Sequence, residues 1–208
     1  LSVIVRDRDE KGTQGFTLFP SHLRTLLSEV QKKKKRLFVF SARRGLAPLV
    51  TCAQCHYIFR SEESGTPYSL LRTIKQGVEE RWFVSHTSGE RIRALDLCPE
   101  CGSWKLKERG IGVQYVHDEL KKILGSTPLF VFDHTTASTW KRAHAIKDAF
   151  YHEKAAVLLG TTMALPYLTE PIDDAIITSM DALLTTPTWR LEEDALALML
   201  QLREITKD

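Results

Sequence analysis

The chain has 208 residues, of which 43% are hydrophobic and 26% are charged, and its formal net charge is +3. This size and composition are typical of one globular domain, or of one domain with a small insert. No apolar run is long enough to span a membrane and the first residues do not read as a signal peptide, so we expect a cytoplasmic protein with no membrane partner. Because the chain opens on Leu1 rather than Met, we treat it as a piece of a longer protein. The mild positive charge permits nucleic-acid binding without requiring it.

The N-terminal part predicts one helix and one strand. Apolar residues recur at helical spacing from Leu23 to Val30, which predicts a helix over 21–34. The short apolar run over 37–40 then indicates a buried strand.

A basic run ends this predicted helix. It consists of Lys32, Lys33, Lys34 and Lys35, and two further cations, Arg43 and Arg44, follow the strand. Such a run suits the solvated C-terminal end of a helix, where the helix dipole favours cations. It equally suits a patch that contacts phosphates. Both interpretations stay open, and these lysines and arginines are our candidate DNA contacts.

The stretch 51–106 holds all four cysteines, short alternating runs such as 81–84, and turn signals at Ser64-Gly65 and Ser88-Gly89. It predicts a small, mostly β insert between a strand and the next helix. An insert of this size has little core of its own, so a bound metal would supply much of its stability.

The rest of the chain alternates helices with strands. Helices are predicted over 113–124, 139–150 and 191–203, and strands over 129–132, 155–159 and 175–178. This alternation is typical of an α/β fold with a parallel sheet.

Two C-x-x-C pairs predict a metal site, formed by Cys52, Cys55, Cys98 and Cys101. A two-residue spacer lets both sulfurs of a tight turn point at one ion, and two such turns complete the tetrahedron that zinc prefers. The two pairs lie further apart in the chain than is usual for a zinc site. The alternatives to zinc binding are free buried cysteines, a redox pair or an iron–sulfur cluster. With every position filled by protein, one zinc ion would be structural.

Several short motifs occur in a fixed order around these pairs. After the strand 37–40 comes the segment 41–48, S-A-R-R-G-L-A-P, and further on stand Gly110-Ile111-Gly112, Gly160-Thr161-Thr162-Met163 and Pro187-Thr188-Trp189-Arg190. This order resembles the PriA family of primosomal replication helicases (primosomal protein N′). That family has N-R-R-G-Y-x-P before a cysteine-rich zinc insert, then G-x-G-T-E, G-T-Q-M and P-D-F-R. The resemblance implies a RecA-like helicase lobe formed by 1–50 and 107–208, with a zinc-binding insert at 51–106.

The resemblance also concerns the serines of the insert. The family has four C-x-x-C pairs, of which the outer two share one zinc and the inner two share another. Where the inner pairs would fall, this chain has serine at Ser61, Ser64, Ser85 and Ser88. A serine hydroxyl does not ionise at neutral pH, so the second metal is expected to be absent.

A helicase of this class binds ATP and magnesium between two lobes, and the second lobe contributes an arginine finger. This chain has no phosphate-loop motif, so no catalytic residue is assigned and ATP and magnesium are expected only with the missing first lobe. Gly160 and Thr161 are the candidate nucleotide contacts that the resemblance implies. Arg203 lies two residues before the expected finger position.

Two functions follow from these observations. The first is the second motor lobe and zinc module of a PriA-like helicase in replication restart, which binds branched or single-stranded DNA and has primosome proteins as candidate partners. The second is a catalytically degenerate relative that serves as a DNA- or protein-binding scaffold.

Three tryptophans can stack on bases or lie in the core or its rim: Trp104, Trp140 and Trp189.

Overall fold

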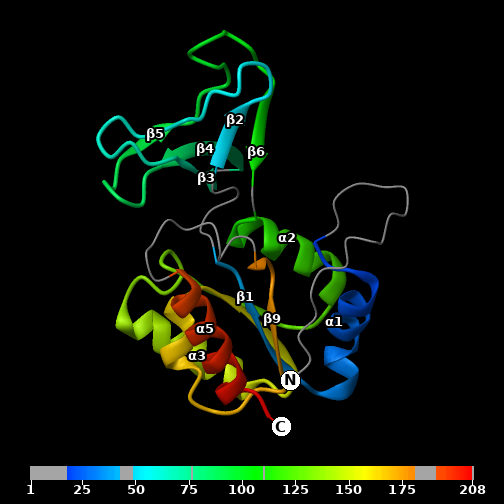
Figure 1. Cartoon of the computed structure of the whole chain (residues 1–208). Helices are drawn as coiled ribbons and strands as arrows, with labels where there is room; N and C mark the ends of the chain where they lie inside the picture. The colour runs from blue at the N-terminus through cyan, green and yellow to red at the C-terminus, as the bar shows by residue number, and fades with distance from the viewer. Residues whose placement is uncertain (1–17, 43–48, 76, 110, 181–190, 208) are drawn as a thin grey trace. The chain divides into compact units, whose positions relative to one another are not determined.

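The computed structural model describes residues 18–42, 49–75, 77–109, 111–180 and 191–207. The chain divides into two compact units (Figure 1). One comprises the chain up to Phe40 and from His117 onward, and the other comprises Ser41–Val116. The insert bounds expected from the sequence, 51–106, stay a prediction. Among the described residues, no helix is long and apolar enough to cross a bilayer.

The first unit is built on a parallel sheet. Its described strands, in the spatial order β7-β8-β1-β9, are β7 (Leu129–Phe132), β8 (Ala156–Gly160), β1 (Arg36–Phe40) and β9 (Asp174–Ile177). The central pair is in register with Phe38 opposite Leu158. Every residue of β8 is buried, as is expected of a central strand covered on both faces.

Helices flank this sheet, with α1 on one side and α3 and α5 on the other in Figure 1. The described helical elements are α1 (Ser21–Lys33), α2 (Val113–Leu124), α3 (Trp140–His152), η1 (Thr162–Tyr167) and α5 (Leu191–Ile205). Helix α1 turns Leu23, Leu27 and Val30 inward, so the apolar spacing read from the sequence marks its buried face. The prediction of an α/β RecA-like lobe with a β-rich insert is confirmed.

The second unit is antiparallel. Its described strands form a pair, β2 (Leu49–Cys52) with β6 (Leu106–Arg109), and a meander of β3 (Ser69–Lys75), β4 (Val78–Val84) and β5 (Arg91–Arg93). A small core of Val50, Phe59, Tyr68, Leu70 and Phe83 joins them. A core this small supplies limited stability by itself.

Candidate metal centre

The two cysteine pairs lie on two tight turns with similar backbones. Cys52 ends β2 and its N–H donates to the carbonyl of Tyr57, while the N–H of Cys98 donates to the carbonyl of Ser103, both at 2.9 Å. The residue after each pair has a left-handed backbone, with φ of 63° at His56 and 69° at Gly102. This conformation closes each turn and leaves its two sulfurs on one side.

The four sulfurs converge. Each Sγ lies within 4.8 Å of the other three. The Sγ atoms of Cys52 and Cys101 are 3.6 Å apart, and those of Cys55 and Cys98 are 3.5 Å apart. A tetrahedron with Zn–S near 2.3 Å has sulfurs about 3.8 Å apart, so the spacing fits zinc after small adjustments. The four thiols can therefore hold one metal ion. Together they would fill all four tetrahedral coordination positions and leave none open for a substrate.

The local electrostatics favour a thiolate at Cys52. Its pKa is lowered to about 6, chiefly by a hydrogen bond from the backbone of Cys55, with a further one from the backbone N–H of Gln54 at 3.3 Å. The thiolate is the form that binds a metal.

Two serine turns repeat the backbone of the cysteine turns. In the cysteine turn at Cys98, the N–H of Gly102 donates back to the Cys98 carbonyl at 2.8 Å. Gly65 donates in the same way to Ser61 at 2.9 Å, and Gly89 to Ser85 at 3.0 Å. Both glycines have positive φ, as Gly102 does. The S-x-x-S-G segments are therefore folded like C-x-x-C-G turns.

The serine hydroxyls meet across the two turns. The Oγ atoms of Ser61 and Ser88 are 3.3 Å apart, and those of Ser64 and Ser85 are 3.1 Å apart. Ser61 also donates to the Glu90 carboxylate at 2.6 Å. Ser61 is 2% exposed and Ser85 is fully buried. A hydrogen-bonded cluster thus joins the two loops where the family resemblance places a second metal.

Glu90 extends this cluster to the core. Burial raises the pKa of Tyr68 to about 12, with a further contribution from its hydrogen bond to the Glu90 carboxylate. The Tyr68 ring stacks on Phe83 with centroids 5.5 Å apart. The serine cluster and the aromatic core of this unit are therefore one connected structure.

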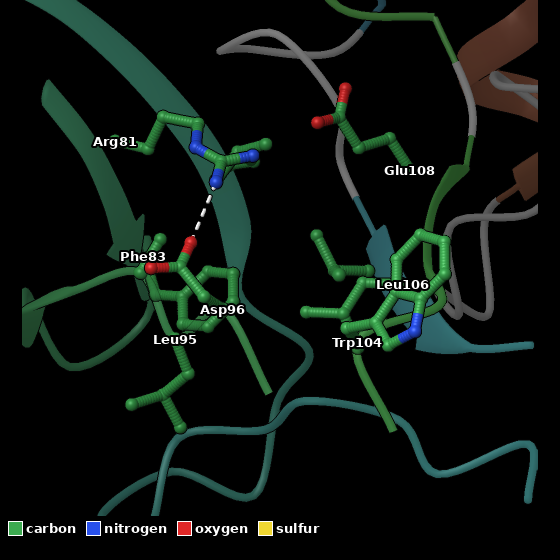
Figure 2. A pocket seen from close by; sticks show the side chains of 10 residues that line it. Arg81, Phe83, Leu95, Asp96, Trp104, Leu106 and Glu108 are labelled. Carbon is green, nitrogen blue, oxygen red and sulfur yellow. Dashed lines mark hydrogen bonds and ion pairs between the residues drawn. The ribbon is translucent and has the colours of Figure 1, made fainter. Parts of the chain in front are cut away.

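A groove of about 120 Å³ lies close to the second cysteine turn (Figure 2). Arg81 and Asp96 form an ion pair of 2.7 Å on one wall, and Trp104, Leu106 and Glu108 lie on the other. Trp104 is 73% exposed. The rim carries charges of both signs, so its chemistry does not single out one ligand class.

The candidate DNA-contacting lysines differ in whether a carboxylate neutralises them. Lys33 pairs with Glu29 at 2.5 Å, and Lys35 pairs with Asp174 at 2.7 Å. These two lysines are partly neutralised, whereas Lys32 and Lys34 have no carboxylate partner among the described residues. Arg43 and Arg44 lie outside the described residues, as do Gly110 and the segment 187–190.

The candidate nucleotide contacts lie at the carboxyl end of β8. Gly160 is closely packed, since a Cβ there would lie 2.8 Å from the Cβ of Ala164. Thr161 caps η1 by accepting from the N–H of Met163. Further along η1, the Tyr167 ring packs on Phe132 with centroids 4.9 Å apart. The carboxyl ends of parallel strands are where α/β sheets bind ligands, so this location agrees with nucleotide contact. The contact itself stays a prediction.

Sequence reasoning missed one cluster, formed by Trp82, Arg91 and Arg93. Arg93 lies opposite Trp82 in the β4–β5 register, and the Arg91 guanidinium lies 4.4 Å from the centroid of the Trp82 ring. The tryptophans considered from the sequence did not include Trp82, because it sits in an alternating run that predicts only a strand. The signal that could have found the cluster is the R-x-R spacing of Arg91 and Arg93 after a turn.

Comparison with known proteins identifies the relatives of this chain. No family model matches it. The replication restart protein PriA of Bacillus subtilis is 28% identical over 199 residues, which cover 95% of this chain and 24% of that protein. The PriA of Synechocystis sp. is 30% identical over 195 residues, covering 91% of this chain and 23% of the relative. The chain is a divergent relative of PriA. A probable PriA of Deinococcus radiodurans adds 26% identity over 183 residues, 88% of this chain and 18% of that protein.

The chain thus spans about a quarter or less of the length of these PriA proteins. The predicted resemblance to PriA is confirmed. The similarity covers both units, since the alignments take in most of the chain.

Proposed function

We propose that this chain is the second motor lobe and zinc module of a PriA-like DNA helicase that acts in replication restart. The observation that carries the proposal is the similarity to PriA over 88–95% of the chain, together with the RecA-like sheet that it folds into. The chain itself binds branched or single-stranded DNA without reading sequence, and primosome proteins are its candidate partners. ATP-driven unwinding belongs only to a protein that also carries the phosphate-loop lobe.

In this proposal Cys52, Cys55, Cys98 and Cys101 hold one structural zinc ion. A tetrathiolate favours zinc over hard cations such as magnesium, and d¹⁰ zinc adapts to the tetrahedron that four sulfurs define. The ion supplies a cross-link between two loops, and the thiolates stay available for it in the reducing cytoplasm.

DNA contact in the first unit depends on the cations that remain unneutralised. Lys32 and Lys34 are the strongest candidates of the basic run, since Lys33 and Lys35 already have carboxylate partners. Arg43 and Arg44 belong to the same proposal. Gly160 and Thr161 would contact nucleotide held by the first lobe. Cation contacts of this kind give weak, salt-dependent affinity that does not depend on base sequence.

The test is a binding isotherm of the zinc-loaded chain with forked DNA at two salt concentrations. We expect the affinity to fall with added salt, and Lys32→Gln with Lys34→Gln to lower the salt slope by up to about 0.9 per lost phosphate contact on duplex DNA. The variant pair Lys33→Gln with Lys35→Gln is the matched control and should change the slope less. A chain that binds no forked DNA at low salt would contradict the proposal.

A second candidate, the catalytically degenerate scaffold, is favoured by the segment after Thr161. Where the resemblance places Lys-Gly-His, this chain has Pro166-Tyr167-Leu168. Tyr167 packs against Phe132 and against His144, with ring centroids 4.9 Å and 5.4 Å away. Leu168, at the position of the histidine, is buried, so this segment has packing side chains in place of the polar ones that the resemblance implies.

Arg203 separates the two candidates. It is exposed on α5, next to the buried Leu202. Two residues on a helix correspond to a rotation of about 200°, so a finger displaced by two positions points to another face. In the full-length protein with DNA, the scaffold reading expects little ATP turnover, and Arg203→Ala should not change it. Robust turnover that falls roughly 10³-fold or more in Arg203→Ala would establish the motor instead.

A further inference from the structure

The outer face of the β3–β4–β5 sheet carries a cationic aromatic cluster. Phe83 and Leu70 point into the core of this unit, so Trp82, the next residue on β4, points to the opposite face. Arg93 is the cross-strand partner of Trp82, and Arg91 lies opposite Val84 two residues further along β4. The register therefore places Trp82, Arg91 and Arg93 on the same face, which we call the Trp82 face.

The two arginines of the Trp82 face are not neutralised. Each residue of β5 is exposed. Within the part of the chain that the structure describes, neither Arg91 nor Arg93 forms an ion pair with a carboxylate. Arg81 provides the contrast, because it lies on the other face of β4 and pairs with Asp96 at 2.7 Å. Glu80 also belongs to the Trp82 face; its side chain is half-buried and one of its carboxylate oxygens is buried.

The Arg91 guanidinium lies over the ring of Trp82. It lies 4.4 Å from the centroid of the Trp82 ring, within the range of a cation–π contact. Arginine planes stack on unpaired bases as aromatic rings do, so the exposed Arg91 can receive a flat group beside the ring. Arg93, on the same face, supplies a charge for an adjacent phosphate.

We propose that the Trp82 face is a contact site for single-stranded nucleic acid, in which a base stacks on the Arg91–Trp82 pair and Arg93 contacts a phosphate. This inference rests on the proposed DNA-binding function and assigns part of it to the zinc module. A nucleic acid fits this face because its phosphates are negatively charged and its bases are planar. These two properties complement two arginines without carboxylate partners beside a tryptophan. Recognition is independent of sequence, since every base has a face that can stack.

The test measures the anisotropy of a labelled oligothymidine with the zinc-loaded chain over a salt series. Arg91→Gln should weaken binding roughly tenfold through loss of stacking and charge. Arg91→Lys keeps the charge and loses the plane, so it should weaken binding with the salt slope unchanged. Arg93→Gln should lower the slope by about 0.7, the value for one phosphate contact on a single strand. Arg81→Gln is the matched control on the opposite face and should bind as the wild type does.

Each variant is checked for unchanged zinc content and melting temperature before binding is compared. Binding by the wild type that is equally strong in Arg91→Gln and Arg93→Gln would overturn this inference while leaving the proposed DNA binding intact. A wild-type chain that binds no nucleic acid would overturn both. Polyglutamate that binds as tightly as oligothymidine would assign the Trp82 face to acidic proteins and also overturn the inference.

Discussion

Replacing one zinc ligand should unfold the second unit rather than weaken it slightly. Cys98 is the ligand to change, because it is 2% exposed and its sulfur lies 3.5 Å from that of Cys55. Two sulfur spacings, 3.6 Å and 3.5 Å, fall just short of the roughly 3.8 Å of a zinc tetrathiolate, and all four sulfurs lie within 4.8 Å of one another, so the loops need only a modest rearrangement to bind. Most of the metal's binding free energy is therefore available as folding free energy.

The magnitude follows from that coupling. Structural zinc contributes about 10–16 kcal/mol at neutral pH, and Cys98→Ser should remove most of it. Whole domains are stable by only about 5–15 kcal/mol, so the unit Ser41–Val116 cannot keep its fold on the small core around Phe83. The first unit, which has its own buried sheet, should stay folded.

The assay combines metal analysis with limited proteolysis. The wild type should contain one zinc per chain, and Cys98→Ser should contain almost none and be cut rapidly within 49–109. Ser103→Ala is the control in the same turn, since it removes one hydroxyl that accepts from the N–H of Lys105 and leaves the sulfurs intact. Two zinc ions per chain, or none in protein made without chelators, would refute the reasoning. Protease resistance of Cys98→Ser equal to that of the wild type would refute the energetic argument.

Three further perturbations test other parts of the structure. Glu90→Gln removes the charge of a carboxylate that accepts hydrogen bonds from Ser61 and Tyr68. It should lower the free energy of unfolding of the zinc-loaded chain, measured with denaturant, by about 1–2 kcal/mol. An unchanged free energy of unfolding would show that the serine cluster does not stabilise the chain. Gly160→Ala places a Cβ 2.8 Å from that of Ala164 and should cost about 1–3 kcal/mol, with partial recovery when Ala164→Gly is added. Burial raises the pKa of Asp133, but hydrogen bonds from Thr135 and Thr136 outweigh it, so the net pKa is lowered. Its stabilising contribution is fully present above the ordinary value of 3.8 and is lost as the pH falls through the lowered pKa of the folded state. Asp133→Asn should therefore destabilise the chain most at neutral pH and progressively less as the pH falls below 3.8, as followed by chemical denaturation over a pH series; a difference that stays constant down to the lowest pH would contradict this assignment.

Local patterns were enough to predict the main helices and strands of the first unit and to single out the four cysteines whose sulfurs converge. The helix over Ser21–Lys33 and the strand over Arg36–Phe40 follow from apolar spacing within one element, because helix and strand periods are properties of consecutive residues. The C-x-x-C pairs are also local, since a two-residue spacer by itself sets two sulfurs on one side of a turn. The serine turns at Ser61 and Ser85 could be recognised only through the family resemblance, but their spacing and glycines were already in the sequence.

Only the tertiary structure decided which residues far apart in the chain come into contact. The sequence determined that a basic run exists, but only folding brings Asp174 to Lys35, across 139 positions, and neutralises part of it. Hydroxyls of the two serine turns meet because the β3–β4 hairpin returns the chain beside its start. Trp82, Arg91 and Arg93 share one face because the β4–β5 register aligns them. Charge compensation and stacking depend on distances in space, and these are set by strand pairing over long separations, which local periodicity does not encode.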